Sequence, residues 1–218
     1  SWAWATKIGN AYDNFVLDML VTPNNEIHVG VLYRETMEFN GNILPPSSER
    51  TVMIAMLNEG GSPVAHVVVE TSEEIEPVGG MCLDGSGQSY AALTFRGEVL
   101  VGETRLDSAG QSDLLVASYE ANQWNWAVTG GGAFEDRAWD CSGSPQQGLT
   151  VVGEYSGNAT FGEYYTESSN NVDMVLSRVS SAGAWAGIAT AGGPGVDRAT
   201  GVVTNAIGEV VVAGTTSG

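Results

Sequence analysis

Basic side chains are scarce in this 218-residue sequence. Eight Lys and Arg residues stand against 26 Asp and Glu residues, which gives a formal net charge of −18. A surface this acidic repels the phosphates of nucleic acids and the anionic headgroups of lipids. We therefore expect no nucleic-acid partner.

Long apolar runs are also missing, since no stretch approaches the about 18 residues that indicate a transmembrane helix. We predict no membrane insertion. Cysteine is limited to Cys82 and Cys141, too few for the disulfide framework of a small secreted domain. The sequence favours two buried thiols on neighbouring strands, and a disulfide between adjacent repeat units stays open as the alternative.

Residues for nucleophilic or metal-assisted catalysis are few. The two histidines, His28 and His66, fall in different parts of the chain, and neither a Gly-x-Ser-x-Gly motif nor a metal-spaced His pair is present. A glycosidase needs only two carboxylates, which 26 acidic residues always offer, so their number carries no weight. We predict a protein that is not an enzyme and that has no cofactor.

What the chain does contain is a repeat of about 60 residues. A Trp-Ala pair begins at Trp4, Trp126 and Trp185, and the segment 65–66 replaces it in the second copy. Apolar runs that end in a small residue keep the same spacing, at 27–30, 89–92, 150–153 and 211–214. The markers divide the chain into units 1–63, 64–123, 124–183 and an incomplete unit 184–218.

The apolar runs in each unit are short, rich in Val, Thr and aromatic residues, and bounded by Gly, Asn, Ser and Pro, as is typical of β-strands. In the third unit we expect strands near 125–129, 137–141, 148–155 and 172–179. Segments 24–25, 84–87 and 205–206 are expected to form one equivalent hairpin turn. The pattern predicts an all-β chain of about 3.5 four-stranded antiparallel blades of a β-propeller.

Three motifs carry a resemblance to a known family. They are Trp-Asn-Trp-Ala at 124–127, Ala-Thr-Phe-Gly at 159–162 and Asp-Met-Val-Leu-Ser-Arg at 173–178. The pattern resembles the SBBP-type β-propeller repeats of bacterial and archaeal extracellular proteins, most sharply in the second half of the chain. This resemblance implies a propeller fold and an extracellular or cell-surface location, and it implies no catalytic residues.

One acidic residue recurs in each unit near the same position. These residues are Asp13, Glu76, Asp136 and Asp197, and we expect all four on one face of the propeller. They are the weak candidates for a metal site, as a ring of carboxylates around a cation. Recurrence in every unit favours instead a role in capping turns by accepting backbone N–H groups. Asp113 and Asp173, which precede apolar runs, are interpreted in the same way.

Several aromatic residues lie where a sugar ring could stack. Tyr155, Tyr164 and Tyr165 occupy polar stretches, so we expect exposed rings there and take these residues as the ligand-binding candidates. Trp124 and Trp126 alternate with polar residues, so both should face one side of their strand, in the core.

The unit count is not whole. The sequence shows no leader peptide, opens inside one repeat and closes inside another, so we expect that natural ends are absent. Four blades could close with one of them incomplete, but an incomplete ring leaves free strand edges, which favours self-association or missing flanking blades. The predicted function is a non-catalytic scaffold or interaction module of a larger secreted or surface protein, with a glycan or a protein as partner. A lectin-like propeller is the alternative, and a glycoside-cleaving enzyme ranks third.

Overall fold

The computed structural model describes residues 3–146 and 148–217. Within these ranges the chain is all-β, with strands, turns and no helix. No described segment is a helix of the length and apolarity that crossing a membrane requires.

Three successive segments each fold into a four-stranded antiparallel meander, in which every strand pairs with the next of the four. Meander I contains β1 (Phe15–Val21), β2 (Ile27–Tyr33), β5 (Thr51–Leu57) and β6 (Pro63–Thr71). Meander II contains β7 (Ile75–Leu83), β8 (Ser89–Phe95), β11 (Asp113–Glu120) and β12 (Gln123–Gly132). Meander III contains β13 (Arg137–Gly143), β14 (Leu149–Phe161), β15 (Tyr164–Val179) and β16 (Trp185–Ala191).

Three hairpins complete the fold. The hairpin β3 (Glu38–Phe39) and β4 (Asn42–Ile43) lies between β2 and β5, and β9 (Glu98–Val101) and β10 (Thr104–Asp107) lie between β8 and β11. After meander III, β17 (Arg198–Thr204) and β18 (Val210–Thr215) form a two-stranded sheet. The sequence units begin one strand before the meanders, because the Trp-Ala pairs lie on β12 and β16, each the last strand of a meander.

The local expectations from the sequence are confirmed. The four strands expected in the third unit are present as β12, β13, β14 and β15. The three expected turns join β1 to β2, β7 to β8 and β17 to β18, and each is closed by a backbone hydrogen bond of 2.9 to 3.0 Å. These features are local, so hydrophobic alternation and turn residues suffice to predict them.

The sheets differ from the expected separate blades of four strands. The structure has a six-stranded sheet, β1-β2-β5-β6-β9-β10, and an eight-stranded sheet built from meanders II and III. Each of these sheets has more than four strands because a hairpin of one meander pairs with the last strand of the meander before it. Thus β9 pairs with β6, and the far end of β14 pairs with β12. Such pairings join distant segments, and no local pattern in the sequence marks them.

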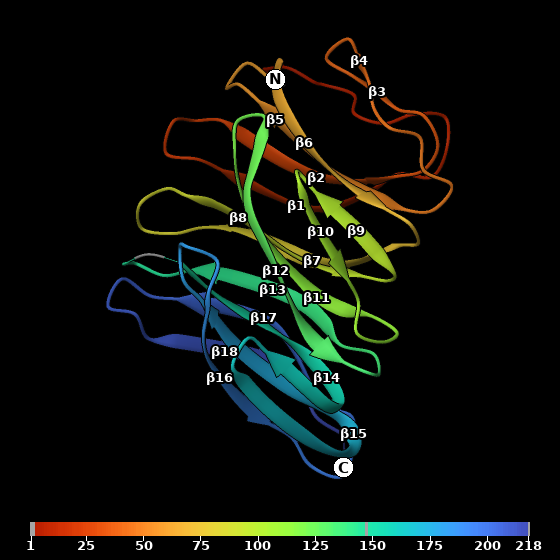
Figure 1. The fold of residues 1–218 in the computed structure, drawn as a ribbon. Coiled ribbons are helices and arrows are strands. Elements are labelled where there is room, and N and C mark those ends of the chain that lie inside the picture. Colours follow the sequence, from red (N-terminus) through yellow and green to blue (C-terminus); the bar gives the residue numbers. More distant parts are fainter. Residues whose placement is uncertain (1–2, 147, 218) are drawn as a thin grey trace.

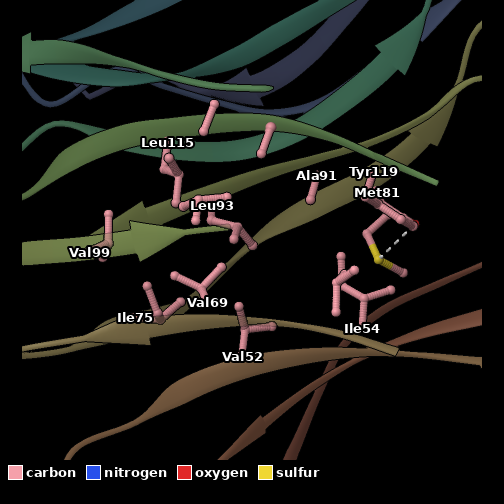
Figure 2. Close-up of a cluster of buried hydrophobic side chains, with 14 of the residues drawn as sticks. Val52, Ile54, Val69, Ile75, Met81, Ala91, Leu93, Val99, Leu115 and Tyr119 are labelled. Atoms are coloured by element: carbon pink, nitrogen blue, oxygen red, sulfur yellow. Dashed lines mark hydrogen bonds between the residues drawn. The ribbon is translucent and has the colours of Figure 1, made fainter. Parts of the chain in front are cut away.

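The meanders lie one after another, so that β1 and β18 lie in opposite parts of the molecule (Figure 1). We call the contact between neighbouring meanders a joint. Joint I–II holds a cluster in which Val52, Ile54 and Val69 meet Leu93 and Leu115 (Figure 2). A second cluster fills joint II–III, and a third, smaller one lies between meander III and the β17–β18 hairpin. Hydrophobic burial therefore holds each meander to its neighbours.

The two tryptophans of β12 pack into different joints, contrary to the expectation that they share one face. The Nε1 group of Trp124 donates to the carbonyl of Val68 at 2.8 Å, whereas Nε1 of Trp126 donates to Ser181 at 2.8 Å. The pairing of β11 with β12 shifts by one residue between Ser118 and Tyr119. A bulge of this kind changes the facing of the side chains that follow it.

Cys82 and Cys141 form a disulfide between β7 and β13, with their Cα atoms 5.9 Å apart. The favoured prediction of two free buried thiols is therefore wrong, and the alternative holds. The first strands of meanders II and III lie close enough for the bond because the meanders stack on one another. The covalent link crosses joint II–III.

Replacing both cysteines with serine should lower the free energy of unfolding by about 2 to 4 kcal/mol, since the bond constrains the unfolded chain. Urea titrations of the wild-type protein and the double variant measure the difference. As a control, alkylation of the unreduced, unfolded wild-type protein should label no thiol. A labelled thiol, or equal stability of the two proteins, would contradict the disulfide.

Candidate functional site

Two of the four predicted once-per-unit acids, Asp136 and Asp197, lie in equivalent turns. Each precedes the first strand of the next segment, β13 or β17. Oδ2 of Asp136 accepts from the N–H of Gly132 at 2.6 Å, and Oδ2 of Asp197 accepts from Gly193 at 2.7 Å. Both side chains are buried. These bonds fit the expected turn-capping role.

The other two acids lie in different surroundings. Asp13 is exposed to solvent, and Glu76 forms ion pairs with arginine side chains. The four residues therefore do not form a ring. In the part of the chain that the structure describes, no group of three or more His, Cys, Asp or Glu side chains is placed to hold a metal ion.

Asp136 has a second carboxylate beside it, that of Asp113 on β11. A Cβ atom added to Gly131 would lie within 3.0 Å of Oδ2 of Asp136 and would also contact Oδ1 of Asp113, so both carboxylates press against this glycine. Oδ2 of Asp113 accepts from the N–H of Ala109 at 2.6 Å, while its Oδ1 is buried without a hydrogen-bond partner among the described residues. Residue 131 must be Gly for this pair to fit.

Burial governs the ionisation of this pair. Loss of water raises the pKa of Asp136 to about 7, against backbone N–H bonds from Ser156 and Gly132 that favour the charged form. The neighbouring charge of Asp113 adds to the rise. Burial also raises the pKa of Asp113, to about 6. The pair therefore holds a proton near neutral pH more readily than a surface carboxylate does.

The same arrangement recurs one repeat later with Asp173, Asp197 and Gly192. A Cβ atom on Gly192 would collide with the carboxylate of Asp173, whose pKa is raised by burial and by the charge of Asp197. Joint I–II lacks the pair. The backbone bond from Ile75 to Arg50 matches those from Asp136 to Ser112 and from Asp197 to Val172, and each is 2.8 Å long.

By this match, Ile75 occupies the position of Asp136. Thr51 follows Arg50 as Asp113 follows Ser112, so Thr51 occupies the position of Asp113. Glu70 then stands 61 residues before Gly131, in the position of the glycine. A joint can thus form without the two acids and without the glycine. The carboxylate pair is a property of two particular joints and not a requirement of the repeat.

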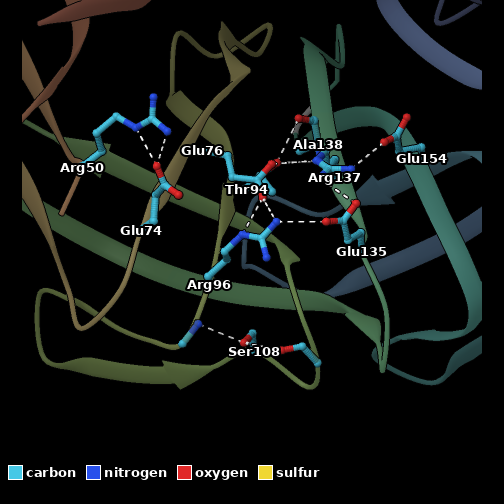
Figure 3. Close-up of polar contacts among 12 residues, drawn as sticks. Arg50, Glu74, Glu76, Thr94, Arg96, Ser108, Glu135, Arg137, Ala138 and Glu154 are labelled. Carbon is cyan, nitrogen blue, oxygen red and sulfur yellow. Dashed lines mark hydrogen bonds and ion pairs between the residues drawn. The ribbon is translucent and has the colours of Figure 1, made fainter. Parts of the chain in front are cut away.

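A network of arginines and glutamates lies beside this pair (Figure 3). Arg137 on β13 is its centre, because its guanidinium bonds Oε2 of Glu76 at 2.7 Å, Oε1 of Glu154 at 3.0 Å and Oε2 of Glu135 at 2.9 Å. Burial disfavours the charge of Arg137, but the hydrogen bonds that Arg137 donates to Glu76 and Glu154 outweigh burial and raise its pKa. Arg96 bonds the other oxygens of Glu76 and Glu135.

The network continues into the last hairpin, where Arg198 on β17 contacts the second oxygen of Glu154. Glu154 is almost completely buried, so these two arginines supply the charge that its burial requires. Arg137 and Arg198 each follow a once-per-unit acid, and they are 61 residues apart. That spacing was the available signal in the sequence, but it does not reveal that both arginines bind Glu154.

The three tyrosine candidates lie in different surroundings. Tyr155 is buried in joint II–III, where its hydroxyl donates to the carbonyl of Glu167 at 3.3 Å. The expectation that its ring is exposed is therefore wrong, because strand β14 turns it into the core. Tyr164 and Tyr165 are exposed at the start of β15. Adjacent strand residues face opposite sides, so these two rings do not form one platform.

The chain matches no protein-family model and no curated protein sequence. The family of the repeat therefore stays a prediction.

Replacing Asp136 with asparagine tests the ionisation of the carboxylate pair. The folded pKa values of about 6 and about 7 lie above the ordinary 3.8, so the folded state binds these protons more tightly than the unfolded state. The free energy of unfolding should therefore fall as the pH rises from 4 to 8, by about 6 kcal/mol for the two groups together. The D136N protein should lose most of this fall in urea titrations.

The exposed acid Glu163 provides the control, since E163Q should keep the wild-type pH dependence. An unchanged slope in D136N would show that the pair does not hold a proton in the folded state.

Replacing Arg137 with methionine removes the centre of the network and leaves Glu76 and Glu154 with too few positive partners. We expect a loss of about 3 to 5 kcal/mol in the free energy of unfolding. Arg105 offers a matched control, because its ion pair with Glu98 is on the surface and its side chain is 64% exposed. R105M should cost less than about 1 kcal/mol. Similar losses in both variants would contradict a structural role for the network.

Proposed function

We propose that this chain is a non-catalytic scaffold and interaction module built as an arc of a β-propeller, within a secreted or cell-surface protein of the SBBP-repeat type. One observation carries the proposal: the contacts between neighbouring meanders recur at the repeat spacing. Each meander is therefore related to the next by a similar rotation and translation. Repeating one rotation about an axis generates a propeller, whose blades are four-stranded sheets.

The recurrence is seen in two kinds of contact. Nε1 of Trp124 bonds the carbonyl of Val68, and Nε1 of Trp185 bonds that of Thr129, each across 56 residues. These bonds join the last strands of neighbouring meanders. Among the first strands, Oδ2 of Asp18 accepts from the N–H of Met81 at 2.7 Å. In the same way, Oδ2 of Asp140 accepts from Val202 at 2.8 Å.

Polar groups at the joints also support a scaffold. Arg137 bonds both Glu76 and Glu154, and the capping oxygens of Asp136 and Asp197 accept hydrogen bonds from backbone N–H groups. Side chains engaged in this way hold the meanders together. The acids and arginines of the joints are thus explained by assembly of the fold.

The disulfide supports the proposed location. Disulfides form and persist in oxidising environments such as the cell exterior and are rare in the cytosol. The Cys82–Cys141 bond joins two meanders, so its formation bears directly on stability. An acidic chain with such a bond is consistent with a secreted or surface protein.

The proposal is tested by screening the whole chain for turnover of chromogenic glycosides and esters and for binding to a glycan array. We expect no turnover and no glycan bound at millimolar concentration. Turnover by the pure protein would overturn the non-catalytic assignment. Glycan binding that is lost in Y165A but kept in Y12A would replace the scaffold by a lectin, since both rings are similarly exposed, at 55% and 59%.

A further inference from the structure

The two ends of the arc each present half of a joint. In joint II–III, Gly130 of β12 lies beneath the rings of Phe161 and Trp185, and a Cβ atom there would be 2.9 Å from the Trp185 ring. Val128 of the same strand packs against this cluster. The last strand of meander II is therefore covered by aromatic side chains of meander III.

The corresponding surface of meander III is open. Thr190 follows Thr129, the acceptor of the Trp185 indole, by 61 residues. A cavity of about 290 Å³ lies over this part of β16, and Ala189, Thr190 and Ala191 line it together with Leu176 and Val212. All three β16 residues are exposed to solvent. The cavity is the position that an aromatic side chain of a following unit would occupy.

The β17–β18 hairpin continues this open end. Val203 and Val211 are directly paired across the hairpin, so their side chains share one face. That face is 63% and 64% exposed at these two residues. The opposite face carries Val202, which is buried against meander III. The hairpin thus covers meander III with one side and leaves the other side without a neighbour.

The N-terminal end shows the complementary half. Val16 and Met19 of β1 are 69% and 61% exposed. Their counterparts 122 residues later on β13, Ala138 and Cys141, are buried against meander II. The surface of a first strand that normally packs on the preceding meander is therefore free on β1.

Residues 3–10 lie where the last strand of a unit preceding meander I would lie, as their sequence counterparts in β12 indicate. Nε1 of Trp4 donates to Glu59 across 55 residues, as Nε1 of Trp126 donates to Ser181 across 55 residues. Gly9 and Gly131, also 122 residues apart, share a positive φ of 142° and 155°. Residues 3–10 belong to no strand, although their counterparts in β12 pair with β11.

We infer that a second copy of this chain docks head to tail on the C-terminal end, with its residues 3–10 over the β16 cavity and its β1 face over Val203 and Val211. The contact repeats the joints within the chain. It rests on the proposed propeller arrangement, because only equal steps between units make the two halves fit. A head-to-tail contact is heterologous and produces either a closed ring or an open filament.

The charge of −18 on each copy opposes association, so the contact should strengthen with salt. Sedimentation velocity of the whole chain at 20 mM and 500 mM NaCl tests this. We expect species larger than a monomer that increase with protein concentration and with salt. A monomer under all of these conditions overturns the inference and leaves the scaffold proposal standing. Turnover in the screen above would overturn the non-catalytic assignment and leave the docking inference standing.

Charged substitutions at exposed positions test the geometry. M19K blocks the N-terminal end and V211K the C-terminal end, so each protein alone should associate at least tenfold more weakly than wild type. An equimolar mixture should form dimers and stop there, because one intact end of each kind remains. T104K is the control, since Thr104 is exposed on β10 in the middle meander, and it should associate like wild type.

Thermal unfolding should confirm that all three variants fold. Assembly of M19K or V211K at the wild-type level would overturn the head-to-tail contact. A mixture that stays monomeric would overturn it as well, since the head-to-tail contact requires only the one end that each variant keeps intact.

Discussion

Coverage of both faces of every sheet is the constraint on which this structure depends. All residues of β5 and β8 are buried, and so are seven of the eight in β11. Because alternate side chains of a strand point to opposite faces, such strands cannot be stable in a sheet with one face in water. Each meander is consequently stable only when both of its faces are covered, by neighbouring meanders or, on the outer face of meander I, by Met37, Phe39 and Leu44 around the β3–β4 hairpin.

Stacking also determines where charge is buried. The closest approach of meanders II and III brings Asp113, Asp136 and Glu154 out of water, and Arg137 enters from the adjacent strand. Gly131 leaves the space for the carboxylates. In joint I–II, Thr51 and Ile75 take the positions of the two acids. Two chemical solutions to one packing problem thus coexist in a single chain.

Features determined by short segments were predictable from the sequence. Turn residues such as Asp84 and Asn205 marked hairpins, and alternating apolar residues marked the strands between them. Recurrence of Asp136 and Asp197 also identified two turn caps. The pattern could not show that Asp113 lies beside Asp136, because that contact joins separate strands whose approach depends on the stacking.

Other features depended on details that a repeat pattern averages out. A one-residue bulge separates Trp124 from Trp126 and sends their rings into different joints. Tyr155 lies in a polar stretch but turns inward on a long strand. The six-stranded and eight-stranded sheets arise because β9 pairs with β6 and β14 pairs with β12, each in the preceding meander. Each of these features could be predicted only if the position of a second segment of the chain was known.

The Cys82–Cys141 bond has a consequence for the resistance of the chain to proteolysis. Its loop encloses the exposed turn at 121–122, where Ala121 has a positive φ of 48°. Exposed turns are preferred sites of proteolytic nicking. A single cut anywhere between the two cysteines leaves both pieces in one covalent molecule, so a nicked chain keeps its meanders together. Cuts in the turn at 24–25 or the loop 192–197 lie outside the loop and have no such protection.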